Sequence, residues 1–88
     1  MMNGRKNMVS YKVVEKDGDI WTYEYLPECE YRPGYIKYNI KTGERILEDI
    51  QWSPDDLGHT YGFHVWGVLD NHYETDNIYP EEGKVAWY

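Results

Sequence analysis

Three histidines that lie among carboxylates are the residues of this sequence with the best chance of binding a metal ion: His59, His64 and His72. On a helix, His64 and His72 would lie about 12 Å apart along the axis, too far to share an ion. Asp55 and His59 are four residues apart and could share one, but two ligands do not make a site. The acidic segment 70–81 lacks the central glycine of an EF-hand calcium loop. We therefore expect no metal site.

Nucleophilic catalysis has equally little support in the sequence. Cys29 lies between Glu28 and Glu30, whose negative charges disfavour the thiolate. Ser10 and Ser53 belong to no nucleophile motif, and the glycine patterns that bind phosphate or dinucleotides are absent. We expect no catalytic residue and no cofactor, and we keep a small enzyme or metal protein only as a third alternative.

Charge is distributed unevenly along the 88 residues, whose formal net charge is −7. Residues 1–47 contain eight Lys and Arg against seven Asp and Glu, whereas residues 48–88 contain only Lys84 against nine acids. An acidic surface repels phosphate backbones and anionic membranes, because binding them requires cations. The pattern indicates either a solvated acidic face or a surface for a basic protein partner, and it argues against nucleic acid and membrane.

Aromatic side chains are unusually frequent, with ten Tyr, four Trp and one Phe in the chain. So many rings are not expected to fit the core of so small a domain, so we expect some at the surface, where Tyr and Trp commonly form interfaces. Two groups are candidates: the loop tyrosines Tyr25, Tyr31 and Tyr35, and the pair Phe63 and Trp66. The alternative is that strand tyrosines only stabilise cross-strand pairs.

The elements that must position these side chains begin with four strands. Apolar and polar residues alternate in four segments, which are residues 8–14, 20–26, 35–40 and 44–50. Gly18 and Gly43 each lie in a turn between two of these segments. The pattern predicts two β-hairpins, preceded by a flexible N-terminal arm (residues 1–7) that has no periodicity.

A helix is predicted from about residue 60 to residue 75, and in one alternative a separate turn at residues 54–58 precedes it. Before it, Ser53 offers a capping hydroxyl, Pro54 suits the first helical position and two acids follow. At about 100° per residue, one helix face would carry the apolar side chains. This face consists of Tyr61, Val65, Val68, Leu69 and His72, and the opposite face of Gly67, Asp70 and Glu74.

Together these elements predict an α+β fold in a single domain (residues 8–88). Two N-terminal hairpins and a short C-terminal strand would form an antiparallel sheet, with the helix packed on one face. The chain end is expected to pair with the sheet and to bury Trp87 largely. The alternative is a small all-β barrel in which residues 60–70 form a strand. The predicted core consists of Val9, Tyr11, Val13, Trp21, Tyr23, Ile36, Tyr38, Ile46, Val65, Val68 and Leu69.

The favoured function is a non-catalytic protein-binding, regulatory or inhibitor module. We expect it to be soluble and cytoplasmic, since no apolar run approaches the length of a membrane span. The predicted partner-binding patch, on the outer face of the helix, consists of Phe63, Trp66, Asp70 and Glu74. Its aromatic rings would anchor a basic protein and its carboxylates would steer the approach.

A single-stranded nucleic-acid binder is the alternative function. Sheet tyrosines would stack on the bases, and nearby cations would contact the phosphates. The cations available for this role are Lys12, Lys37, Lys41 and Arg45.

Overall fold

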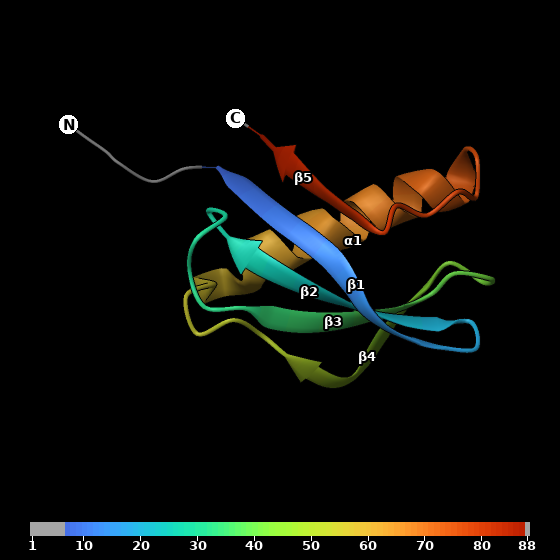
Figure 1. Cartoon of the computed structure of the whole chain (residues 1–88), viewed down its shortest axis with the longest axis horizontal. Coiled ribbons are helices and arrows are strands. Elements are labelled where there is room, and N and C mark those ends of the chain that lie inside the picture. Colours follow the sequence, from blue (N-terminus) through green and yellow to red (C-terminus); the bar gives the residue numbers. More distant parts are fainter. Residues whose placement is uncertain (1–6, 88) are drawn as a thin grey trace.

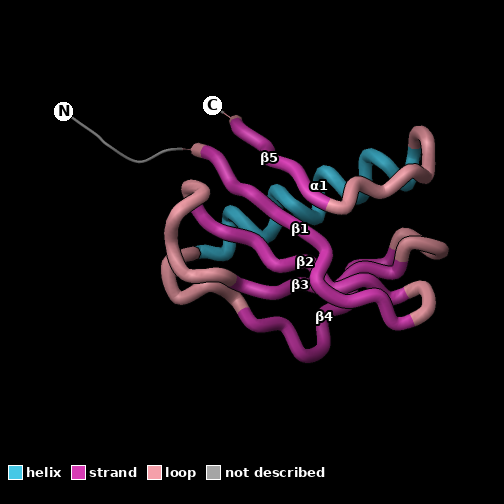
Figure 2. The backbone as a smooth tube through the Cα atoms, viewed as in Figure 1, coloured by secondary structure: helices cyan, strands magenta, loops and turns pink. Residues whose placement is uncertain are grey.

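The computed structural model describes residues 7–87 and has two layers, a sheet and a helix (Figure 1). The elements in chain order are β1 (Met8–Asp17), β2 (Ile20–Pro27), β3 (Gly34–Asn39), β4 (Glu44–Gln51), the 3₁₀ turn η1 (Leu57–His59), α1 (Thr60–Glu74) and β5 (Glu82–Ala86). The five strands form one antiparallel sheet in the order β4-β3-β2-β1-β5. Figure 2 shows α1 running along one face of this sheet.

The predicted α+β fold is confirmed. The sheet is open rather than closed, and residues 60–70 are helical, which excludes the barrel alternative. Residues 1–6 of the predicted arm lie outside the described residues.

Both hairpins turn at the predicted glycines. β1 and β2 are joined by a two-residue turn in which Gly18 has a φ of 59°. In the longer turn between β3 and β4, the Asn39 side chain accepts the N–H groups of Lys41 and Thr42, and Gly43 has a φ of 76°. Residues other than glycine rarely adopt these backbone angles, so the two glycines determine where the chain reverses direction.

The core between the sheet and α1 is built largely from tyrosine. Its buried members are Val9, Tyr11, Tyr23, Tyr25, Ile36, Tyr38, Tyr61, Val65, Trp66 and Leu69. Several phenol groups reach a hydrogen-bond acceptor at the rim of the core: Tyr23 donates to the Pro80 carbonyl at 2.8 Å, and Tyr61 donates to Glu28 at 3.0 Å. These tyrosines thus fill the core with their hydroxyls paired, whereas the buried hydroxyl of Tyr79, which packs against the core, has no hydrogen-bond partner among the described residues.

Two predictions about the core are wrong. Tyr25, expected at the surface beside the loop, is 0% exposed, because its hydroxyl donates to the buried carboxylate of Asp56 at 2.8 Å. Ile46, expected in the core, lies directly opposite Lys37 in the β3–β4 pairing. Residues directly opposite each other share a face of the sheet, so Ile46 belongs to the face that points away from α1.

The end of the chain pairs with the sheet, as predicted. β5 lies antiparallel to β1, and the Trp87 N–H donates to the Asn7 carbonyl at 3.0 Å. Trp87 itself is half-buried rather than largely buried, because its ring stacks on the half-exposed ring of His64 with centroids 3.6 Å apart. The strand prediction is thus confirmed, whereas the burial of Trp87 is less complete than predicted.

The buried tyrosines are expected to make the fold sensitive to alkali. Burial raises the pKa of Tyr23, Tyr25 and Tyr38 above the ordinary value of 10.0. Unfolded tyrosines ionise near pH 10, so the unfolded state loses these protons first. Stability is therefore complete below pH 10 and falls above it by about 1.4 kcal/mol per pH unit for each such tyrosine.

Circular dichroism and tyrosinate absorbance, followed together through an alkaline titration, check this prediction. We expect one cooperative step in which the secondary structure is lost as the buried tyrosines ionise. Ionisation of all ten tyrosines near pH 10 with the secondary structure retained would contradict it.

Candidate functional site

Asp56 sets the start of the helix that carries the candidate site. Its carboxylate is only 2% exposed and accepts the N–H groups of Tyr61 and Gly62, each at 3.0 Å. It also accepts the Tyr25 hydroxyl at 2.8 Å. Free N–H groups in the first turn of α1 are thereby satisfied, and the helix start is tied to β2.

Ser53, the capping residue that the sequence suggested, caps a turn that precedes η1 rather than α1 itself, as in the alternative of a separate turn at residues 54–58. Its hydroxyl accepts the N–H of Asp55 at 3.0 Å, in the turn before η1. The chain then passes through left-handed backbone angles at Gly58 (φ 81°) and His59 (φ 62°) before α1 begins. The His59 ring stacks on Trp52 with centroids 3.9 Å apart, which helps to hold this unusual conformation.

The predicted patch on the outer face of α1 does not exist as a single exposed surface. Trp66 is 0% exposed, and its indole N–H donates to the Lys37 carbonyl at 3.1 Å. The prediction that Trp66 is an exposed anchor is therefore wrong. The helix is rotated about its axis relative to the predicted orientation, which leaves Val68 and His72 half-buried at its boundary. The buried side chains of α1 are Tyr61, Val65, Trp66 and Leu69.

Asp70 connects the helix to the sheet. Its carboxylate accepts the Tyr38 hydroxyl at 2.8 Å and the Arg45 guanidinium at 2.6 Å. Burial, together with this bond, raises the pKa of Tyr38. Asp70 is thus a paired carboxylate, and its expected role in steering a partner stays a prediction. Phe63, at 45% exposed, and Glu74 are the two members of the predicted patch that remain exposed.

A hollow of about 290 Å³ lies on the outer face of α1, lined by Gly58, Thr60, Phe63, His64 and Gly67. Gly67 is exposed, and a β-carbon added to it would meet no other atom within 4 Å. No packing contact in the described part of the chain requires glycine here. Glycine inside a helix nevertheless costs about 0.8–1 kcal/mol relative to alanine. The helix therefore gives up stability at a position where its surface stays open.

Gly62 provides the contrast within the same helix. It is buried, and a β-carbon there would come within 2.7 Å of the Trp52 ring. Packing of Trp52 on α1 thus requires a glycine at this position, whereas nothing comparable applies to Gly67. The sequence signal for the hollow was the placement of Gly67 on the polar face of the predicted helix, between residues that could themselves contact a partner.

Aromatic rings border the hollow and are held in place by their neighbours. The Phe63 ring lies 5.5 Å from Trp52 and 5.6 Å from Trp66, measured between centroids. The His64 ring stacks on Trp87 with an interplanar angle of 10°. Rings that are already packed lose little conformational entropy when a partner covers them.

The helical layer has no Lys or Arg of its own. From residue 46 to residue 83 the sequence contains nine Asp and Glu and no Lys or Arg. Three lysines instead lie on the face of the sheet that points away from α1: Lys12, Lys37 and Lys84. These nine acids are not confined to the helical layer, since Glu48 and Asp49 belong to β4 and Glu82 to β5. α1 itself contains two acids, Asp70 and Glu74, and no Lys or Arg.

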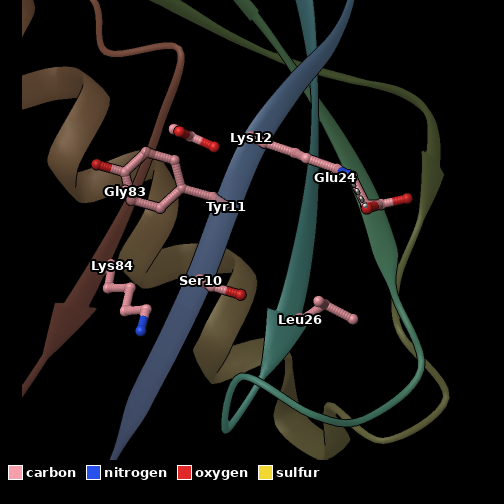
Figure 3. A pocket seen from close by; sticks show the side chains of 8 residues that line it. Ser10, Tyr11, Lys12, Glu24, Leu26, Gly83 and Lys84 are labelled. Atoms are coloured by element: carbon pink, nitrogen blue, oxygen red, sulfur yellow. Dashed lines mark ion pairs between the residues drawn. The ribbon is translucent and has the colours of Figure 1, made fainter.

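The face of the sheet that points away from α1 has a larger hollow, of about 440 Å³ (Figure 3). Its lining is formed by Ser10, Tyr11, Lys12, Glu24, Leu26, Glu82, Gly83 and Lys84. The Lys12 ammonium lies 3.8 Å from the Glu24 carboxylate, which also accepts the Tyr35 hydroxyl at 2.9 Å. Two of the four charged groups in the lining thus bind each other, whereas Glu82 and Lys84 form no ion pair among residues 7–87.

Most of the sheet tyrosines considered for base stacking are buried. The sheet tyrosines that point toward α1 are at most 7% exposed, and they are Tyr11, Tyr23, Tyr25 and Tyr38. Arg45, one of the four cations considered for phosphate contacts, is bound to Asp70. Tyr35, which is half-buried and donates its hydroxyl to Glu24, is a sheet tyrosine that shares the outward face with Lys12 and Lys37. The alternative therefore retains one ring beside cations and stays a prediction.

Among residues 7–87, no group of three or more His, Cys, Asp or Glu side chains is arranged to hold a metal ion. His72 contacts Asp76 at 3.1 Å, and the other two histidines stack on Trp rings. Cys29 is half-buried and has a free thiol. Within the same residues, no helix has the length and apolar character needed to cross a membrane.

Comparisons with models of protein families, with curated proteins and with solved structures find no match for this chain. The fold defines a small α+β domain with a tyrosine-rich core, and its function has to be inferred from its own surface.

Proposed function

We propose that this protein is a non-catalytic binding module that holds a basic partner protein on the outer face of α1. Gly67 is the observation that carries the proposal. It is an exposed glycine in the middle of a helix, it has no packing role, and it lines a hollow beside Phe63 and His64. Because Gly67 has no side chain, a side chain of the partner can occupy the space above it, which a larger residue at this position would fill.

Phe63 takes the anchoring role that the sequence had suggested for Trp66. Its ring is 45% exposed, while Trp52 and Trp66 support it from the protein side. A partly exposed ring on a rigid aromatic base is typical of residues that dominate the binding energy of an interface. The contact expected here is an apolar partner side chain that packs against Phe63 and over Gly67.

The charge of the helical layer favours a basic partner. The region from residue 46 to residue 83 contains no Lys or Arg, and Glu74 is exposed on α1 seven residues after Gly67, on the same side of the helix. Opposite charges at the rim of an interface mainly accelerate association, and salt weakens their effect. An apolar side chain flanked by Lys or Arg would match this surface.

Gly67→Ala is the substitution that tests the proposal. The free energy of unfolding is expected to rise by about 0.8–1 kcal/mol, because alanine favours the helix and meets open space. Affinity for a basic probe is expected to fall by about tenfold, because the added methyl group intrudes on the contact. The probe is an amphipathic helical peptide with leucines on one face and lysines on the other, measured by calorimetry.

Asn71→Ala serves as the matched control, since it also replaces an exposed residue of α1 by alanine but adds no atoms to the hollow. Its affinity for the probe is expected to stay unchanged. The proposal is overturned if the probe does not bind at millimolar concentration, or if the same peptide with glutamate in place of lysine binds equally well. It is also overturned if Gly67→Ala binds as tightly as the original chain.

A further inference from the structure

The two edges of the sheet differ in regularity. At one edge, the pairing of β4 with β3 shifts register between Tyr35 and Lys37, and Asp49 in β4 has a φ of 61°. At the other edge, β5 pairs with β1 without a shift, from Lys12 opposite Glu82 to Met8 opposite Ala86. Irregular edges discourage pairing with a further strand, whereas a regular edge remains open to it.

No strand lies beyond β5 among the described residues, and Figure 1 shows β5 at the margin of the sheet. The side chains of β5 that point away from α1 include Glu82 and Lys84, which are both exposed. Neither forms an ion pair within residues 7–87. Glu82 and Lys84 flank Gly83. The exposed edge therefore carries a negative charge on one side of Gly83 and a positive charge on the other.

This arrangement is complementary to itself. If two copies of β5 pair antiparallel about a two-fold axis at Gly83, Glu82 of each copy lies directly opposite Lys84 of the other. Centring the pair on Lys84 or on Glu82 would instead place like charges opposite each other. Opposite charges in directly facing positions stabilise strand pairing and like charges destabilise it, so the charges select the register centred on Gly83.

We propose that β5 is a self-association edge, through which a second copy of this chain extends the sheet as an antiparallel, two-fold dimer. A two-fold interface requires one surface to match itself, which is the property of the Glu82–Gly83–Lys84 segment. Shifting the pairing by one residue would place a β5 residue that faces α1 opposite a residue of the other copy that faces away from its own α1. The two helices would then lie on opposite sides of the joined sheet, so these registers are disfavoured. This dimer uses the sheet edge and is independent of the hollow at Gly67.

Sedimentation equilibrium from micromolar to millimolar concentration tests the proposal. The original chain is expected to show a concentration-dependent rise of its mass toward that of two copies. Glu82→Lys and Lys84→Glu are each expected to weaken the dimer by about tenfold or more, since each places like charges opposite each other at two symmetric positions. Glu74→Lys, the same charge change on α1, is expected to leave the dimer unchanged.

The decisive sample is an equal mixture of the two single variants. The Glu82→Lys chain carries two lysines at the edge and the Lys84→Glu chain carries two glutamates, so a mixed dimer regains both opposite-charge pairs. We expect the mixture, and also the doubly exchanged chain, to associate as strongly as the original. A monomer at every concentration would overturn the dimer, and a mixture no more associated than either variant alone would overturn the proposed register. Circular dichroism spectra identical to that of the original chain establish that the variants are folded.

Discussion

Replacing Trp66 with alanine is expected to lower the free energy of unfolding by about 3–5 kcal/mol. The Trp66 ring is 0% exposed, lies 5.7 Å from Trp52 between centroids, and donates its N–H to the Lys37 carbonyl. Its removal leaves a cavity between α1 and the sheet, together with a carbonyl that loses its bond. Small domains are stable by only about 5–15 kcal/mol, so a large share of the total would be lost.

Thermal and denaturant unfolding measure this loss. Phe63→Ala, which truncates a partly exposed ring of the same cluster, is expected to cost clearly less. Trp66→Phe retains a ring and is expected to remain folded if the alanine variant does not. An unchanged melting temperature for Trp66→Ala would show that the ring is not part of the core.

Asp56→Ala is expected to cost about 2–4 kcal/mol. Three donors lose their acceptor at once: the N–H groups of Tyr61 and Gly62 and the hydroxyl of Tyr25. The Tyr25 hydroxyl lies inside the core and cannot turn to water. The cost of leaving this hydroxyl without an acceptor therefore adds to the cost of the unpaired N–H groups at the helix start. Hydrogen exchange at the amides of Tyr61 and Gly62 should accelerate more than exchange in the strands.

Asp55→Ala is the matched control, because Asp55 is the adjacent acid and binds Arg32 at the exposed surface. Such pairs contribute little to stability, so this variant is expected to unfold nearly as the original does. Equal losses for the two substitutions would contradict the assignment of Asp56 as the acceptor that starts α1.

The order of elements could be predicted because its signals are local. Alternating strands, the turn glycines Gly18 and Gly43 and the helical spacing after residue 60 lie within short stretches of chain. The rotation of α1 could not be predicted in the same way, because a helical projection ranks faces only by their apolar content. Trp66 faces inward because its N–H finds the Lys37 carbonyl and because Asp70 is bound by Arg45, and both partners come from distant strands.

The tyrosine core was predicted only in part: Tyr11, Tyr23 and Tyr38 were expected in it and are buried, whereas Tyr25 was expected at the surface. The large number of aromatic rings suggested that some of them must lie at the surface. A tyrosine hydroxyl that has a hydrogen-bond partner, however, avoids the free-energy cost of burying an unpaired polar group. For Tyr25 and Tyr38 these partners are Asp56 and Asp70, which are 31 and 32 residues away in the sequence. The hollow at Gly67 was not predicted, although the placement of Gly67 on the polar face of the helix was, because the rings that border the hollow are set by tertiary packing.

The most direct test of the binding surface is a nuclear magnetic resonance titration of the isotope-labelled protein with the basic amphipathic peptide. Contact with the outer face of α1 predicts that the largest amide shift changes occur at Thr60, Phe63, His64 and Gly67. These changes should decrease as salt is added, because carboxylates assist the encounter. Shift changes confined to the opposite face of the sheet, at Ser10, Leu26 and Lys84, would contradict the proposed function.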